Sequence, residues 1–363
     1  MLEKLFDEYL FTGALVFIIS FLIVYLVVPN ITSVIVRRRL NDIPNNRSSH
    51  ETPTPTMAGF AFFFTLIFVL FFIQRFDNDQ IAINIIAATS LIFMVALKDD
   101  LVSVPPRVKI IVELMAISML LYSGSFNELN FHGFLGLYQL ATPLSYSLII
   151  IGMLTIINAY NLIDGIDGLA AIIAIIIFIS FGLIFFIDGN LWFYVLICIA
   201  FIGMLLAYLR YNLSNKRKIF MGDTGSLIVG FAIGICSIKF LTLEPSSLSS
   251  FSFLPENGLF LLLAILWIPI FDMIRVIYIR LKNKKSPFYP DQNHVHHVLI
   301  NLGLRHHQVA IIIGVFNYLI MILIGILSIY LNYLQMLGVV IVLFFSLMIL
   351  FSNLKKKSIQ NKV

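Results

Sequence analysis

Long apolar runs follow one another along almost the whole chain, and each is close to the length that crosses a bilayer. A membrane-spanning helix needs about 20 apolar residues. Because such runs recur eleven times with only short polar segments between them, the sequence predicts an all-α, polytopic membrane bundle that forms one domain over residues 1–363. The predicted spans are 10–28, 58–73, 81–97, 108–122, 143–159, 169–187, 191–209, 225–243, 258–280, 309–331 and 334–352.

The composition agrees with lipid as the main solvent. Hydrophobic residues make up 60% of the chain and charged residues 12%, against about 25% charged in a typical soluble domain. Cys198 and Cys236 lie inside apolar runs and are predicted to be buried small hydrophobes, not a disulfide or metal ligands. The acidic N-terminus MLEKLFDEYL is unlike the basic start of a signal peptide, so no cleavable signal is expected.

The positions of the basic residues predict the orientation. If the N-terminus is outside, twenty of the 24 Lys and Arg residues fall in inside loops or in the C-terminal tail, as basic residues of membrane proteins usually do. The predicted outside loops, such as 123–142 and 244–257, carry few charges and no clusters. This asymmetry explains the net charge of +5 without a nucleic-acid partner, and no base-reading module is visible. The C-terminus is accordingly predicted to be cytoplasmic.

Polar residues are concentrated in five loops on the predicted cytoplasmic side. In the first loop, 42–60, Arg47 and His50 could bind an anion, or the segment could be an ordinary basic loop. In the second, Asp99 and Asp100 end an apolar helix at the unfavourable end of its dipole. They should be compensated by nearby basic residues, namely Lys98 and Arg107, or by a divalent cation. Adjacent helical residues point about 100° apart, so one carboxylate should meet a substrate while the other orients a partner.

The third and fourth loops carry further carboxylates. The third contains two Asn and two Asp residues with no basic residue between the flanking spans, and such oxygens suit Mg²⁺, although Asp-Gly pairs also form turns. Its polar residues are Asn158, Asn161, Asp164 and Asp167. In the fourth loop, Asp223 lies among small residues just before a helix. That helix start could expose backbone N–H groups to a phosphate, or Asp223 could simply cap it.

The fifth loop contains a histidine cluster, His294, His296 and His297. Three His residues can bind Zn²⁺ or can hold a phosphate, and their spacing is not the i, i+4 pattern of a zinc-binding helix. Phosphate binding is favoured because acidic loops suited to Mg²⁺ accompany the cluster. His306 and His307 are predicted to be surface residues, and Asp272 and Arg275 are predicted to pair along their helix.

Together the five loops resemble those of the polyprenyl-phosphate N-acetylhexosamine-1-phosphate transferases (glycosyltransferase family 4). The resemblance covers residues 40–300 and rests on the Asp pair, the segment NAYNLIDGIDG, the segment MGDTGS and the run NHVHH. It implies that Asp99 or Asp100 deprotonates an acceptor phosphate and that Asn158, Asn161, Asp164 and Asp167 contact a nucleotide sugar, with Asp164 and Asp167 also catalytic. It further implies that Asp223 and Asp164 hold a metal, that Phe220 stacks on uracil, and that Arg47, His50 and the three histidines bind substrate.

The implied reaction moves N-acetylhexosamine 1-phosphate from a UDP-sugar to polyprenyl (undecaprenyl) phosphate at the inner membrane, with release of UMP. Mg²⁺ is the implied cofactor, with Mn²⁺ as an alternative. The run HxHH after SPFYPD resembles the GlcNAc-1-phosphate branch. The segment RSSHETPTP resembles enzymes that start O-antigen, lipopolysaccharide or capsule-type polysaccharides, some of which accept 6-deoxy-N-acetylhexosamines, so the donor sugar stays open between the two. The segment PTPTMAG is nearer to the phospho-MurNAc-pentapeptide transferases, and Ser103 replaces an acidic residue of many relatives. A lipid-linked sugar transporter is the rival from another class, and a homodimer stays open.

Overall fold

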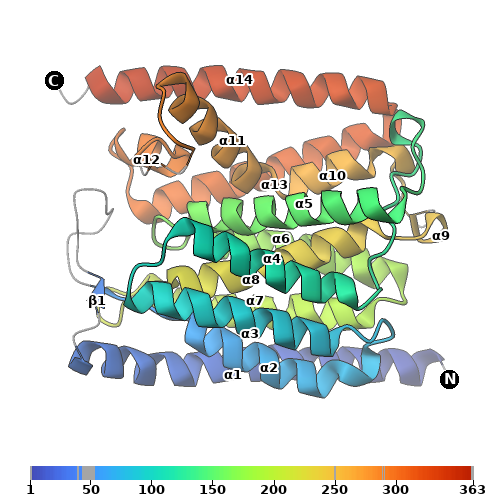
Figure 1. Cartoon of the computed structure of the whole chain (residues 1–363), viewed down its shortest axis with the longest axis horizontal. Coiled ribbons are helices and arrows are strands. Elements are labelled where there is room, and N and C mark those ends of the chain that lie inside the picture. Colours follow the sequence, from blue (N-terminus) through green and yellow to red (C-terminus); the bar gives the residue numbers. More distant parts are fainter. Residues whose placement is uncertain are drawn as a thin grey trace.

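The structure is a computed structural model that describes residues 2–38, 41–42, 54–248, 251–287, 289 and 291–360. Helices make up nearly all of it (Figure 1), which confirms the predicted all-α class. Within the described residues, the strands are the two-residue segments β1 (Asn41–Asp42) and β2 (Thr54–Pro55), which pair antiparallel.

The long helices lie side by side and run roughly parallel to the long axis of the bundle (Figure 1). They are α1 (Leu2–Arg38), α2 (Gly59–Ile73), α3 (Ala82–Leu101), α4 (Pro106–Tyr122), α5 (Thr142–Ile163), α6 (Leu169–Asp188), α7 (Trp192–Asn212), α8 (Gly222–Leu241), α11 (Trp267–Lys282), α13 (His306–Tyr330) and α14 (Tyr333–Gln360). The short helical segments are η1 (Gln74–Phe76), η2 (Phe134–Gly136), α9 (Pro245–Leu248), η3 (Pro255–Asn257), α10 (Gly258–Ile265) and α12 (Val295–Ile300).

Each of the eleven predicted spans contains a helix, but fewer qualify as membrane spans. Among the described residues, nine helices are long and apolar enough to cross a membrane, and a tenth span results if the bent pair α10 and α11 is counted as one. Helix α4 is not one of them, because it has only 17 residues and carries Lys109 and Glu113. The predicted number of eleven is therefore too high for the described part of the chain.

The prediction of one continuous helix over residues 258–280 is wrong, because two helices joined by a sharp bend occupy this range. Helices α10 and α11 meet at Leu266 with a bend of 71°. Pro269 is the third residue of α11, so it has no N–H to donate to the carbonyl of Ile265, and its ring would clash with that carbonyl in a continuous helix. The break therefore follows from the sequence, although the apolar run conceals it.

Helix α8 lies at the centre of the bundle. Of its apolar window 89% is buried, against 17% for α14, and it packs against α2, α3, α5 and α6. Its small residues allow this close packing, because a Cβ atom on Gly230 would lie 3.1 Å from the backbone of Ile157 on α5. The position of α8 matters for function, since its first turn carries Asp223.

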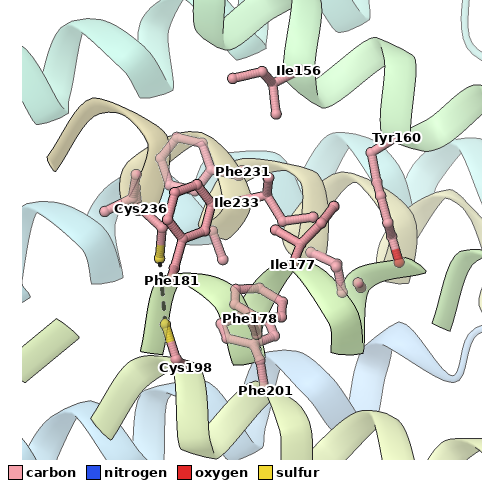
Figure 2. Close-up of a cluster of buried hydrophobic side chains, with 14 of the residues drawn as sticks. Ile156, Tyr160, Ile177, Phe178, Phe181, Cys198, Phe201, Phe231, Ile233 and Cys236 are labelled. Atoms are coloured by element: carbon pink, nitrogen blue, oxygen red, sulfur yellow. Dashed lines mark hydrogen bonds between the residues drawn. The ribbon is translucent and has the colours of Figure 1, made fainter. Parts of the chain in front are cut away.

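Aromatic and branched side chains from α5, α6, α7 and α8 form one dense cluster beside this central helix (Figure 2). Within it, the rings of Phe178 and Phe201 stack with centroids 4.7 Å apart. The thiols of Cys198 and Cys236 are buried, and their sulfur atoms are 3.8 Å apart, without a disulfide bond. The predicted role of both cysteines as small buried side chains is confirmed.

The described parts of the five polar loops gather at one end of the bundle, where β1 and α12 lie at the left of Figure 1. Helix α1 starts at the opposite end and α14 finishes at the same end as these loops. At that opposite end, Lys239 of α8 and the hydroxyl of Tyr194 both donate to Asp79, at 2.7 Å and 2.6 Å. Lys239 belongs to a helix and not to an outside loop, so this single ion pair ties α8 to the segment between α2 and α3.

Candidate active site

Asp100 holds the start of α8 in place. Its carboxylate accepts hydrogen bonds from the backbone N–H groups of Asp223, at 2.8 Å, and Thr224, at 3.1 Å, and from the Thr224 hydroxyl. A carboxylate at a helix N-terminus is also favoured by the helix dipole. These N–H groups are therefore bound by the protein itself, so the expectation that they are exposed to a phosphate is wrong. Asp223 does not cap the helix either.

Asp99 faces a different partner, the ammonium group of Lys109 on α4. The distance from Lys109 Nζ to Asp99 Oδ2 is 2.6 Å, and the same Nζ contacts Oδ2 of Asp223. The other Asp99 oxygen accepts the N–H of Val104 at 2.5 Å. The compensating cation is thus Lys109, not Lys98 or Arg107 as expected. Two carboxylates from different helices share one cation here.

The two asparagines of the third loop have different roles in the packing. Asn161 donates its amide N–H₂ to Asp223 Oδ1, at 3.1 Å, and to Ser226 Oγ, at 2.7 Å. Asn158 instead donates to Glu113 Oε2 of α4, at 2.7 Å. Asn161 thus contacts Asp223, one of the two carboxylates that share Lys109, whereas Asn158 contacts the buried carboxyl group of Glu113. Glu113 was not among the expected site residues, although its position one turn after Lys109 in an apolar helix was a signal.

Asp164, directly after α5, is in an acidic environment. Burial, together with the charges of Asp223, Asp100 and Asp167, raises the pKa of Asp164 to about 7. Like charges that crowd one another favour protonation, and a cation among them would reverse that effect. The four carboxylates therefore form a region in which an added positive charge is stabilised.

Asp167 is paired with two basic side chains. Lys218 Nζ lies 2.6 Å from Asp167 Oδ2, and His306 Nδ1 lies 3.2 Å from the same oxygen. Burial favours the neutral acid, but the hydrogen bonds from His306 and Lys218 outweigh it and hold the pKa of Asp167 below its usual value. The expectation that His306 is only a surface residue is wrong, whereas His307 is exposed as expected.

The histidine cluster is anchored to α11. Asp272 accepts from His294 Nδ1 and from the N–H of Val295, both at 2.9 Å. Arg275 lies 3.8 Å from Asp272, so the expected pair exists, and it also donates to the carbonyl of Asn293 at 2.5 Å. A carboxylate on Nδ1 fixes the tautomer of a histidine and leaves Nε2 for another partner. Asp272 therefore orients the first histidine of the cluster.

The other two histidines connect this cluster to the third loop. The His296 ring is buried, and a Cβ atom on Gly165 would lie 2.4 Å from its Nε2 atom. Only glycine permits this approach. In the described part of the chain, His296 Nε2 has no hydrogen-bond partner. Burial lowers the pKa of His296 well below its usual value, and burial with the charge of His294 lowers that of His297 to about 4, so both are neutral at pH 7.

The first and fourth loops are joined by backbone hydrogen bonds. The N–H of Phe220 donates to the carbonyl of Pro55 at 2.8 Å, and the N–H of Ala58 donates to the carbonyl of Phe220 at 3.2 Å. Lys218 lies over the Phe220 ring, 5.3 Å from its centroid. Phe220 is thereby fixed beside Lys218 and Asp167. Arg47 and His50, the expected anion-binding residues of the first loop, lie outside the described residues.

Comparison with known proteins gives a consistent result. Residues 82–241 match the model of the family described as "Glycosyl transferase family 4". This range contains α3 to α8 and all five carboxylates of the site, Asp99, Asp100, Asp164, Asp167 and Asp223. The chain is similar to the undecaprenyl-phosphate alpha-N-acetylglucosaminyl 1-phosphate transferase of Salmonella typhi, with 27% identity over 315 residues that cover 85% of this chain and 78% of the relative. The protein of the same name from Escherichia coli (strain K12) is 27% identical over 74% of this chain and 71% of its own. A "Probable undecaprenyl-phosphate N-acetylglucosaminyl 1-phosphate transferase" of Bacillus subtilis (strain 168) is 28% identical over 83% and 80%.

Proposed function

Because this chain belongs, through residues 82–241, to glycosyl transferase family 4, we propose that it transfers a sugar 1-phosphate from a UDP-N-acetylhexosamine to undecaprenyl phosphate. An oxygen of the lipid phosphate attacks the phosphorus that carries the sugar. The bond from this phosphorus to the bridging oxygen breaks, and UMP leaves with that oxygen. Any proton on the attacking phosphate passes to a carboxylate of the site. The names of the relatives support this general reaction.

One observation carries the proposal: carboxylates from α3 and α8 meet at a shared cation beside the third loop. Asp99 and Asp223 both contact Lys109, and Asn161 donates to Asp223. Phosphoryl transfer needs mainly positioning and electrostatic stabilisation, which such a cluster at one end of a membrane bundle can supply. A lipid-borne acceptor also explains why the cluster belongs to a membrane protein.

Asp99 is our candidate for the group that acts on the acceptor. Its side chain is partly exposed, and only one of its two carboxylate oxygens accepts a hydrogen bond from the backbone, from the N–H of Val104. Asp100 has its carboxylate engaged at the start of α8, so we assign it to positioning Asp223. Lys109 neutralises both neighbouring carboxylates and can turn to a substrate phosphate when they are otherwise occupied. We favour a single in-line displacement, with a covalent carboxylate intermediate as the alternative.

The family resemblance implies Mg²⁺, and the oxygen ligands of the cluster fit it. Within the described ranges, no group of three or more His, Cys, Asp or Glu side chains forms a ready-made metal site. Mg²⁺, however, is often held by one or two carboxylates together with waters and substrate phosphates. We assign Asp223 and Asp164 as its protein ligands because the family resemblance implies them, and the acidic surroundings of Asp164 favour an added cation. When bound, Mg²⁺ would neutralise charge on the diphosphate.

We assign donor binding to the residues around the third, fourth and fifth loops. Phe220 offers a ring for uracil, and the histidine cluster, in which the neutral rings of His296 and His297 can each donate through one N–H, faces the diphosphate or the sugar. Asn161 orients Asp223, and Asn158 supports the third loop through Glu113. Asp167 we assign to a positioning role through Lys218. Arg47 and His50 remain proposed substrate-binding residues of the first loop.

We place the site at the cytoplasmic face of the inner membrane, with the N-terminus outside. The asymmetry of Lys and Arg residues supports this orientation. The product would be the first lipid-linked intermediate of a cell-surface polysaccharide. GlcNAc 1-phosphate is our first choice of transferred group, because the relatives are named for it.

The test is a donor panel. Purified protein would be incubated with undecaprenyl phosphate, Mg²⁺ and one UDP-sugar at a time, and UMP and the lipid product would be followed by mass spectrometry. We expect turnover of UDP-GlcNAc that EDTA abolishes and that added Mg²⁺ restores. Turnover of UDP-MurNAc-pentapeptide alone would assign the chain to the peptidoglycan branch. The absence of UMP with every donor would contradict the transferase and favour transport of a lipid-linked sugar.

Replacing Asp272 with Asn is expected to reduce turnover by about 10–100-fold, as changes to groups that orient a functional histidine often do. The Asn side chain can accept from Val295 but presents N–H₂ to His294 Nδ1, which reverses the tautomer. Turnover and donor KM would be measured on protein with an unchanged elution profile. The variant His307→Gln, at an exposed position of the neighbouring segment, should keep full turnover. Equal turnover in both variants would contradict the role of Asp272.

A further inference from the structure

The segment that carries the histidine cluster is held by side chains of α11. Arg280 Nε lies 3.0 Å from Asp291 Oδ2, and Arg280 also donates to the carbonyl of Pro287. Asp272 and Arg275 hold the next residues, as described above. These contacts fix the start of the segment and the backbone around Asn293, but none of them reaches the Asn293 side chain.

That side chain hydrogen-bonds to Asp291 within its own segment, and from outside the segment it is held by the last helix. Lys355, near the end of α14, donates from Nζ to Oδ1 of Asn293, the residue directly before His294. One turn earlier on the same face, the Phe351 ring lies over the guanidinium of Arg275, 5.5 Å from its centroid. Phe351 also contacts the Phe271 ring, with centroids 6.0 Å apart. Two successive turns of α14 therefore contact the support of the histidine cluster.

The sequence around Lys355 gives no hint of this contact. Lys355, Lys356 and Lys357 form a basic run after the last span, which the charge rule for inside segments fully explains. In the structure Lys356 and Lys357 are exposed, whereas Lys355 is half-buried and turned toward the bundle. Phe351, Lys355 and the buried Ser358 follow the i, i+4, i+7 spacing of one helix face. The contact is therefore specific to one of three adjacent, identical residues.

We propose that Lys355 is a positioning residue for the histidine cluster, and that the end of α14 thereby forms part of the support of the donor site. Its ammonium fixes Asn293, and Asn293 sets the path of the backbone into His294. The inference rests on the proposed function, in which this cluster holds the diphosphate or the sugar of the donor. Arg275 still binds the Asn293 carbonyl when Lys355 is absent, so the segment loosens without unfolding. Loss of the contact should therefore weaken donor binding more than it slows the reaction.

The test compares three variants of the full-length protein. Lys355→Met keeps the apolar stem and removes the charge, Lys355→Arg keeps a donor, and Lys356→Met makes the same change at the exposed neighbour. We expect Lys355→Met to raise the KM for the UDP-sugar about tenfold, the scale of one lost charge-assisted hydrogen bond, with little change in kcat or in the KM for undecaprenyl phosphate. Lys355→Arg should recover most of the effect, and Lys356→Met should match the unaltered protein.

A second readout does not depend on activity. Backbone hydrogen exchange of residues 291–298 should be faster in Lys355→Met than in Lys356→Met, with no difference at residues 99–101. An unchanged donor KM together with unchanged exchange in Lys355→Met would overturn the inference. The proposed function would fail differently, through the absence of UMP release by the unaltered protein. Faster exchange in Lys355→Met would then still support the structural half of the inference.

Discussion

Replacing Asp99 with Asn should reduce turnover by about 10²–10⁴-fold, the usual effect of losing a group that transfers a proton in the transition state. The change removes the charge and the basicity of Asp99 but keeps its size. Its oxygen can still accept the N–H of Val104, and the side chain is not deeply buried. We therefore expect a variant that purifies and elutes like the unaltered protein. UMP release from matched amounts of protein would measure the effect.

The neighbouring substitution Asp100→Asn provides the contrast. Asp100 accepts hydrogen bonds from two backbone N–H groups and a hydroxyl at the start of α8. Asn can satisfy only part of this set and has lost the negative charge that the helix N-terminus favours. Asp100→Asn should therefore lower the melting temperature as well as turnover, whereas Asp99→Asn should affect turnover alone. Near-normal turnover in Asp99→Asn would contradict the assignment of Asp99.

Replacing Gly59 with Ala should destabilise the protein by about 3 kcal/mol or more, because overpacking against fixed atoms is not relieved by side-chain movement. The added Cβ atom would lie 2.1 Å from the backbone nitrogen of Gly225, where α2 crosses the first turn of α8. Only a shift of one helix can remove this clash. The shift would also displace Asp223, two residues before Gly225. Yield and thermal stability in detergent would measure the effect.

The matched control is Gly152→Ala on α5. A Cβ atom at Gly152 meets nothing within 4 Å, so Ala should be neutral or should stabilise the helix by about 0.5–1 kcal/mol. Both changes add one methyl group to a helical glycine, and they differ only in the surroundings. Equal melting temperatures for the two variants would show that α2 and α8 do not cross as closely as described.

The sequence allowed the helices to be predicted better than their bends and ends. Apolar runs indicate where helices form, since each run reflects a need to remove the backbone from lipid. An apolar run does not reveal a helix break when the residue that causes the break has no polar side chain. Pro269 is such a residue, because it lies inside the run 258–280 without interrupting its apolar character. Helix α4 is the reverse case, a helix that forms although charged residues interrupt its apolar run. These residues are Lys109 and Glu113, and both contact residues of the candidate site, so the same residues that mark the site weaken the signal for the span.

Residue types at the site were predictable, but their partners were not. Carboxylates, amides and histidines stand out in an apolar chain, and the order of the loops indicated a shared site. The contact of Asp100 with the start of α8, and that of His306 with Asp167, join residues more than one hundred positions apart. Only the packing of the helices brings them together. Local spacing instead favoured Lys98 and Arg107 as partners of the Asp pair, and Lys109 was missed.

The central claim is that the phosphate attached to the sugar moves with it to the lipid. The most direct test uses a UDP-N-acetylhexosamine labelled with ³²P in the phosphate that carries the sugar, with undecaprenyl phosphate as the acceptor. Transfer of a sugar 1-phosphate places the label in the organic-extractable lipid and releases unlabelled UMP. Label that stays in the aqueous phase as UDP, while the sugar appears on the lipid, would show a simple glycosyl transfer and would contradict the proposed reaction.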